Sequence, residues 1–88
     1  MERELQAYHY ELLARMFKKR IIKSNYKPIE TISRWCGWEQ IVREYGGGHI
    51  KSAIRDLENW GLVSRHGKKV VASLTVDGVL VARNYLQL

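Results

Sequence analysis

The most informative segment of the chain is residues 50–63, which read IKSAIRDLENWGLV. Its apolar residues Ile50, Ile54 and Leu57 stand at i, i+4 and i+7, so they share one face of a helix that we expect over 49–60. The glycine that follows them is at the position where helices commonly end in a left-handed residue. The segment therefore predicts a helix with an apolar inward face, followed at once by an extended run.

Beyond that glycine the apolar residues follow the period of a strand. The runs LVSR at 62–65 and VVASL at 70–74 flank the turn sequence HGKK. This pattern predicts a β-hairpin over 62–75 with a glycine at its tip. Thr75 is a favoured N-cap residue, so a last helix is expected in the C-terminal segment 76–88.

The upstream part of the chain has the pattern of helices. Residues 1–23 contain no glycine or proline, and their apolar residues recur at spacings of three and four, which predicts one long helix. Two shorter helical pieces are expected at 28–37 and 38–45, and the triple glycine at 46–48 supplies a turn before the next helix. A chain of 88 residues with this composition forms a single domain. We expect a mostly α fold with a small β-hairpin.

Two motifs in this arrangement resemble those of the winged helix-turn-helix superfamily. The pattern Ile50-x-x-x-Ile54-x-x-Leu57-x-x-x-Gly61-Leu62-Val63 is similar to a hydrophobic recognition helix that runs into a wing, and Leu74-Thr75-x-x-Gly78 is similar to the entry into a closing helix. In this resemblance residues 38–60 are the helix-turn-helix, 62–75 the wing and 76–88 a C-terminal dimerisation helix. The segment 28–37 is an insertion relative to the simplest core, and the triple glycine replaces a start of the recognition helix that is usually rich in Ser and Thr.

Among small winged-helix proteins, a long first helix combined with an apolar closing helix is similar to PadR-type regulators. It is also similar to small archaeal DNA-binding proteins, including the AspA-like adaptors that coat DNA in plasmid segregation. The resemblance implies a double-stranded DNA-binding protein that acts as a transcription regulator or as an adaptor in plasmid or chromosome segregation, with a partner protein from one of those systems.

The charge distribution favours the same kind of partner. Fifteen Lys and Arg against nine Asp and Glu give a net charge of +6, and the excess lies in residues 15–27 and 47–69. Basic segments of this kind favour a polyanion, although a solvated surface is the alternative, and electrostatics at a helix end also explain the first cluster. If the helix over 49–60 docks in a major groove, its outward residues read bases while the hairpin cations contact the backbone or minor groove. The candidate DNA-binding residues are His49, Lys51, Ser52, Arg55, Arg65, Lys68 and Lys69.

A second expectation concerns association of the chain with itself. The first helix has a double apolar row and the closing helix carries six apolar residues, which is more apolar surface than one small core covers. We expect a two-fold homodimer built from these two helices. The interface residues are predicted to be Tyr8, Leu12, Leu80 and Tyr85.

Several other classes of protein are not indicated. One cysteine and three scattered histidines give no zinc-ligand spacing, and the triple glycine is not followed by the Lys and Ser/Thr of a phosphate-binding loop. No catalytic residues, metal or cofactor are therefore expected, and Cys36 is interpreted as a small buried hydrophobe. The longest apolar run has four residues and no signal peptide is evident, so no membrane partner is expected and the protein is placed in the cytoplasm, on the nucleoid.

The sequence also allows an alternative function. Winged helices also serve as protein- or RNA-binding modules, as in ribosomal components and complex scaffolds, and in that case the charge is incidental. Salt dependence of duplex binding separates the two hypotheses, because phosphate contacts give a steep dependence.

Overall fold

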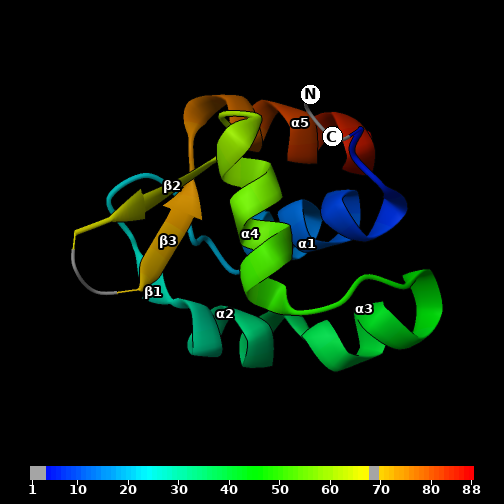
Figure 1. The fold of residues 1–88 in the computed structure, drawn as a ribbon. Helices are drawn as coiled ribbons and strands as arrows, with labels where there is room; N and C mark the ends of the chain where they lie inside the picture. The colour runs from blue at the N-terminus through cyan, green and yellow to red at the C-terminus, as the bar shows by residue number, and fades with distance from the viewer. Residues whose placement is uncertain (1–3, 68–69) are drawn as a thin grey trace.

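The computed structural model describes residues 4–67 and 70–88, and over these ranges it contains five helices and one three-stranded antiparallel sheet (Figure 1). The expectation of a mostly helical chain with a small antiparallel sheet is confirmed. In chain order the elements are α1 (Ala7–Lys18), β1 (Lys27–Pro28), α2 (Ile29–Cys36), α3 (Trp38–Tyr45), α4 (Ile50–Asn59), β2 (Val63–His66), β3 (Val71–Leu74) and α5 (Val76–Leu86). In that part of the chain no helix has both the length and the apolar character needed to cross a membrane.

The sheet joins distant parts of the chain, with the strand order β1-β3-β2. β2 and β3 form the expected antiparallel hairpin, in which Val63 pairs with Leu74. β1 was not expected from the sequence. It pairs with the other edge of β3, where Lys27 is opposite Ala72, so the last strand in sequence is the central strand of the sheet.

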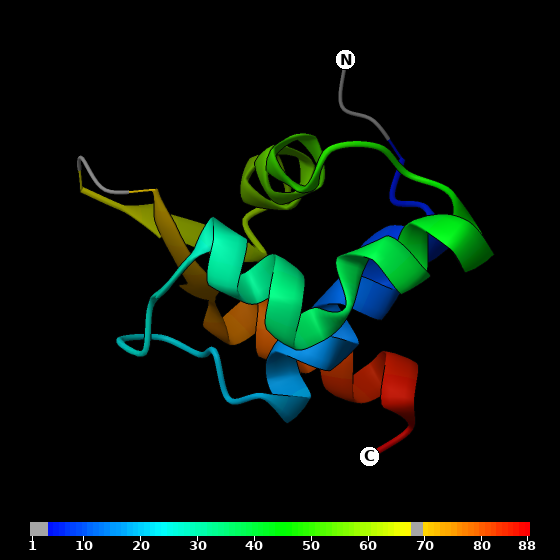
Figure 2. The same ribbon diagram turned by 90° about the horizontal axis from the view of Figure 1, so that it is seen from below.

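α1 is the central helix of the fold and packs against α2, α3, α5 and β3. Figure 2 shows it between the α2–α3 pair and α5. Its residues Leu12, Leu13 and Met16 are completely buried. Complete burial of an aliphatic side chain of this size contributes about 1.5–3 kcal/mol relative to exposure, so α1 supplies a large part of the core.

The prediction of one helix over residues 1–23 was wrong, because α1 ends at Lys18. Arg20 and Lys23 have positive φ angles of 58° and 53°, which turn the chain out of the helix on either side of the buried Ile21. The Ile21 carbonyl accepts a hydrogen bond from the Leu74 amide at 2.9 Å, and the Lys23 amide donates to the Leu74 carbonyl at 2.8 Å. Pairing with the end of β3 and burial of Ile21 thus replace the last part of the expected helix, residues 19–23.

Gly37 separates α2 from α3 and has the left-handed angles φ 65° and ψ 50°. A non-glycine residue in this conformation costs roughly 1–2 kcal/mol. A Cβ at this position would also lie 3.1 Å from Nη1 of Arg15, which reaches across from α1. Glycine therefore allows both the sharp turn between the two helices and the close approach of Arg15.

The start of α5 is locked onto the turn between α4 and β2. The Thr75 side chain accepts a hydrogen bond from the Gly78 amide at 3.1 Å, which caps the helix as its position in the sequence predicts, and its hydroxyl donates to the Gly61 carbonyl at 2.7 Å. The backbone of Gly78 lies so close to Leu62 that a Cβ there would be 2.0 Å from the Leu62 carbonyl oxygen. Only glycine fits at position 78 without moving α5.

We predict that Gly78→Ala lowers the free energy of unfolding by about 1–3 kcal/mol or more, because the new methyl group displaces α5 from the Leu62 carbonyl. The control is Gly48→Ala, since a Cβ at Gly48 meets no atom within 4 Å. This control should leave stability unchanged or raise it by about 0.4–1 kcal/mol through the unfolded chain. Urea denaturation followed by circular dichroism measures both variants. Equal stabilities would show that the close approach is not a constraint.

Candidate nucleic-acid interface

The outward face of α4 carries the residues that the sequence indicates. Ala53, Ile54 and Leu57 are buried and fix which side of the helix faces the core. The opposite side is exposed and, in Figure 1, α4 lies on the near face of the molecule. The structure brings together on this exposed side or at its N-cap the predicted residues His49, Lys51, Ser52 and Arg55.

α4 is held to α1 by a buried polar contact. His9 of α1 is 1% exposed, and its Nε2 lies 3.0 Å from Oδ2 of Asp56. The Nδ1 atom of the same ring accepts a hydrogen bond from the Gln6 amide at 2.9 Å, which assigns the proton to Nε2 and makes Nε2 the donor to Asp56. This contact sets the rotation of α4 about its own axis, and so determines which of its side chains face solvent.

The turn before α4 is packed rather than open. Gly47 has φ 118°, and a Cβ there would lie 3.3 Å from the rings of both Trp38 and Tyr8. The Trp38 indole N–H donates to the Gly48 carbonyl at 2.9 Å. Of the three glycines, Gly47 therefore allows the close contact between this turn and the aromatic side chains of α3 and α1.

The hairpin next to α4 is tied to it by an ion pair. Nε of Arg65 lies 3.1 Å from both carboxylate oxygens of Glu58, and Nη2 lies 3.0 Å from Oε1. Arg65 was predicted to contact DNA, and it remains exposed at the edge of the hairpin with part of its charge offset by Glu58. The predicted contacts Lys68 and Lys69 lie outside the described residues.

A second contact fixes the hairpin on its other side. The His66 ring stacks on Tyr26 with centroids 4.7 Å apart and an interplanar angle of 22°. Neither this stack nor the Glu58–Arg65 pair was predicted from the sequence. The sequence signal for the Glu58–Arg65 pair was the presence of opposite charges on either side of Gly61, where the turn brings the two side chains together.

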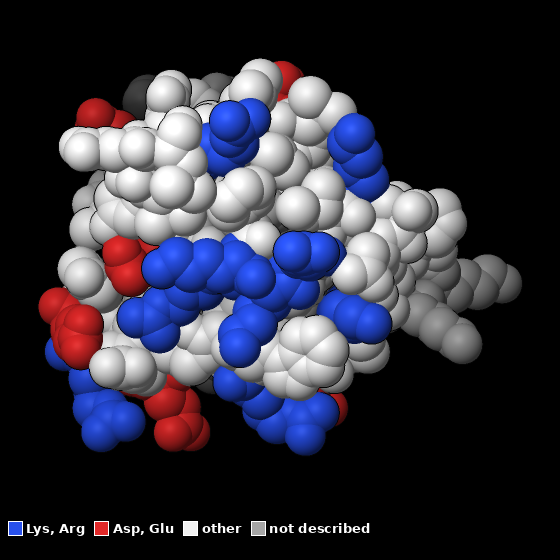
Figure 3. All heavy atoms as spheres, turned by 180° about the vertical axis from the view of Figure 1, so that it is seen from behind, with Lys and Arg blue, Asp and Glu red and all other residues white. Residues whose placement is uncertain are grey.

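Part of the first basic segment lies at a hollow away from the α4 helix itself. Figure 3 shows the face that is hidden behind α4 in Figure 1, and Lys and Arg side chains gather near its middle. Four cations from the first segment and α2 line one hollow between α1 and α2, namely Arg15, Lys18, Lys19 and Arg34. None of these four cations belongs to α4 or to the β2–β3 hairpin.

The predicted dimer residues are mostly engaged within the chain. Leu12 is completely buried in the core, so its assignment to an interface was wrong. Tyr8 packs edge-on against Trp38, with ring centroids 6.1 Å apart, and Tyr85 stacks on Tyr10 at 5.6 Å. α1 and α5 pack against each other, and Val79 and Val81 of α5 are partly buried against the core, whereas Val76 stays exposed. Leu80 does remain 54% exposed.

Cys36 is a buried residue with an unreactive environment. Burial raises the pKa of its thiol to about 12, although the nearby cations Arg15 and Lys19 act in the opposite direction. At neutral pH the thiol is therefore protonated and a poor nucleophile. Across residues 4–67 and 70–88, no group of three His, Cys, Asp or Glu side chains is placed to hold a metal ion.

Comparisons of the chain with models of protein families, with curated proteins and with solved structures gave no match. The residues and geometry of the chain itself therefore carry the functional argument.

We predict that Asp56→Ala lowers the free energy of unfolding by about 1.5–3 kcal/mol, the usual contribution of a hydrogen bond to a charged group. Asp56→Asn keeps an oxygen acceptor for Nε2 of His9 and should cost less. Glu4→Ala removes an exposed carboxylate and serves as the control. Denaturant titration of all four proteins is the measurement. A loss in Glu4→Ala as large as that in Asp56→Ala would contradict a specific role for the His9–Asp56 contact.

Proposed function

We propose that the chain is a winged helix-turn-helix protein that binds double-stranded DNA. In this proposal α4 enters the major groove, and the β2–β3 hairpin follows the backbone or the adjacent minor groove. The observation that carries the proposal is the exposed face of α4, where Lys51, Ser52 and Arg55 stand on consecutive turns of one helix. Within the described part of the chain, neither Lys51 nor Arg55 forms an ion pair, so both charges are available to a ligand.

The order of elements supports this proposal. α3, the glycine turn and α4 form two successive helices joined by a short connection, and an antiparallel hairpin follows directly. The Glu58–Arg65 pair joins that hairpin to α4, and the Tyr26–His66 stack joins it to the segment before β1. A helix and a hairpin held in a fixed relation can contact adjacent grooves of one duplex at the same time.

The residue types on α4 fit recognition of base edges. Arg and Lys donate to O6 and N7 of guanine, and Ser contacts either a base or a phosphate. In this proposal His49, the N-cap residue of α4, contacts DNA together with Lys51, Ser52 and Arg55. The two roles that the resemblance implies differ here, since a transcription regulator reads a preferred site whereas a segregation adaptor that coats DNA depends mainly on phosphate contacts.

We expect Arg55→Ala to weaken binding to a preferred duplex by about 1–3 kcal/mol and to reduce discrimination between sequences. The matched control is Arg34→Ala, which removes the same charge from an exposed position in α2 on the other side of the molecule. It should bind duplex DNA with nearly the affinity of the wild type. Fluorescence anisotropy with a duplex selected from a random-sequence pool, at two salt concentrations, measures both effects.

The possible results of this experiment separate the alternatives. A uniform loss on every sequence in Arg55→Ala indicates a DNA-coating role. Unchanged duplex affinity in Arg55→Ala contradicts placement of α4 in the groove. Tighter binding to structured RNA than to duplex DNA, or a flat salt dependence, favours the RNA- or protein-binding module instead.

We also propose that the chain forms a two-fold homodimer through the outer face of α5. Val76 and Leu80 are one helical turn apart on this face and are 57% and 54% exposed. Aliphatic side chains exposed to this degree on one helix face are typical of interfaces. A dimer would present two copies of α4, as palindromic DNA sites require.

For this dimer we predict that Leu80→Glu shifts the chain to a monomer at tens of micromolar (roughly the range of a weak dimer), because two carboxylates would face each other across the two-fold axis. Leu88→Glu replaces another exposed apolar residue, beyond the end of α5, and should have a smaller effect. Sedimentation velocity measures the association state. A monomeric wild-type chain at that concentration would exclude the dimer.

A further inference from the structure

We propose that the hollow between α1 and α2 is a binding site for a phosphate monoester, separate from the proposed DNA interface. The hollow has a volume of about 340 Å³, and its lining includes Arg15, Lys18, Lys19 and Arg34. No carboxylate is among the described residues that line it. A phosphate monoester carries a charge of roughly −1.5 to −2 at neutral pH, which suits four converging cations.

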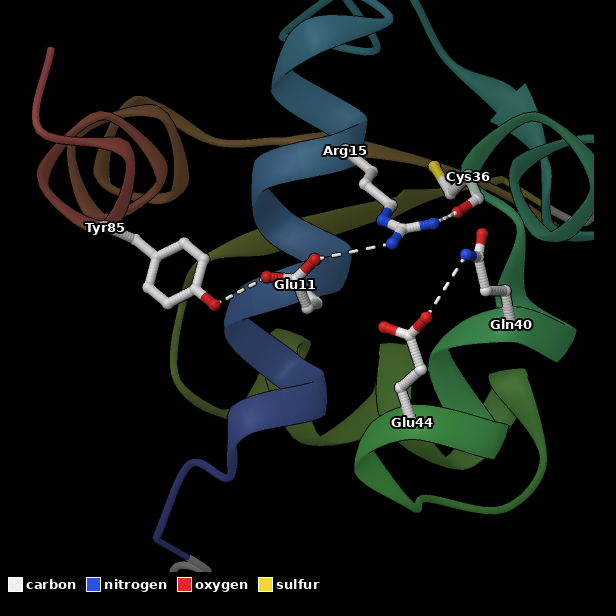
Figure 4. Close-up of polar contacts among 6 residues, drawn as sticks. All are labelled: Glu11, Arg15, Cys36, Gln40, Glu44 and Tyr85. Carbon is white, nitrogen blue, oxygen red and sulfur yellow. Dashed lines mark hydrogen bonds and ion pairs between the residues drawn. The ribbon is translucent and has the colours of Figure 1, made fainter.

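Arg15 is the recessed cation of this site and is already held in position. Its Nη1 donates to the Cys36 carbonyl at 2.9 Å, and its Nη2 lies 3.5 Å from Oε1 of Glu11 (Figure 4). A guanidinium has more N–H donors than these two contacts use, and its planar donor geometry matches a phosphoryl group. Because Glu11 and the end of α2 fix the side chain, little rotamer entropy is lost when a ligand binds.

Glu11 is the nearest counter-charge and is itself shared. Its other carboxylate oxygen accepts a hydrogen bond from the Tyr85 hydroxyl at 2.5 Å, and this bond raises the pKa of Tyr85 to about 12 (Figure 4). Lys18, Lys19 and Arg34 are exposed, and none of them forms an ion pair within the described ranges. Glu11 offsets part of the charge of Arg15, and Lys18, Lys19 and Arg34 leave the hollow with a net positive charge among the described residues.

The rim of the hollow offers contacts for the rest of such a ligand. Trp35 borders it and is 47% exposed, with the Lys27 ammonium 5.5 Å from the indole ring centroid. Gln40 contributes an amide on the α3 side, where it also donates to Glu44 at 3.2 Å. A ring-bearing body could pack on the indole while its phosphoryl group reaches Arg15, as base–aromatic stacking allows for a nucleotide.

The recessed position of Arg15 favours a terminal phosphate over the phosphodiester of a duplex. A monoester can insert its phosphoryl group between two helices, whereas a backbone phosphate is flanked by sugars on both sides. In Figure 2 the C-terminal end of α1, which contributes Arg15 and Lys18 to the hollow, lies on the side of the molecule away from α4. Occupancy of the hollow therefore neither requires nor blocks a duplex at α4.

The site can be tested on the full chain by NMR titration with inorganic phosphate, AMP and adenosine. We expect AMP to give saturable shifts of the Gly37 amide and the Trp35 indole N–H, with a Kd of about 1 mM or tighter. Inorganic phosphate should shift the Gly37 amide more weakly, and adenosine should leave it unchanged because it lacks the anion. Acetate at the same ionic strength controls for a general effect of anions.

A pair of double variants with equal charge loss tests the residues. Lys18→Gln with Arg34→Gln should weaken AMP binding by about tenfold or more, as expected from the loss of two charged hydrogen-bond donors. Lys51→Gln with Arg55→Gln removes the same charges from α4 and should leave AMP binding within about twofold of the wild type, since neither residue lines the hollow and solvent screens exposed charges. Arg15 is kept intact in both, because it also joins α1 to the end of α2.

Three results would overturn the proposal. The first is the absence of saturable shifts with AMP and phosphate, and the second is equal weakening of AMP binding by both double variants. The third is a loss of duplex affinity in Lys18→Gln with Arg34→Gln while AMP fails to bind, which would assign this face to nucleic acid. Duplex binding by Arg55→Ala is measured separately, so failure of this site and failure of the proposed DNA interface give different results.

Discussion

The packing of α1 against the rest of the molecule is the constraint from which the other arrangements follow. Its buried face supplies Leu12, Leu13 and Met16 to a core that α2, α3, α5 and β3 complete from different sides. Two polar contacts then leave the same helix in different directions, His9 toward α4 and Arg15 toward the end of α2. Both candidate sites are thus positioned by one helix, which also supplies Arg15 and Lys18 to the hollow.

The two basic surfaces consequently have different physical characters. On α4 the cations Lys51 and Arg55 are exposed on a convex helix face, where their side chains can adjust to the groove of a ligand. Between α1 and α2 they surround a hollow in which one guanidinium is already oriented by a carbonyl and a carboxylate. The first arrangement suits a long polyanion, and the second suits a small one, because preorganisation benefits a ligand that has few contacts to make.

How much of the fold and of the candidate sites the sequence predicts depends on how far apart in the chain the interacting residues lie. The helix over 50–59, the hairpin and the outward residues of α4 follow from local periodicity and turn chemistry, and these agree with the structure. The end of α1 does not follow from local sequence. Arg20 and Lys23 have left-handed backbone angles where the chain turns to pair with β3, which is about fifty residues away. Leu12 was assigned to an interface because an apolar row does not reveal whether its partner is α5 of the same chain. The hollow arises only when α1 and α2 pack together.

The central position of β3 has a consequence for how the chain reaches its structure. Lys27 pairs with Ala72, and Ile22 forms a bridge to Leu74, so the sheet closes a loop that contains most of the helices. Such non-local pairing slows folding, because the chain loses the entropy of loop closure before the contacts that stabilise the sheet have formed. During synthesis the N-terminal helices must wait for residues 71–74 to leave the ribosome before Ile21 has its final neighbours. We therefore expect the N-terminal helices of the nascent chain to lack their final packing until residues 71–74 have emerged from the ribosome.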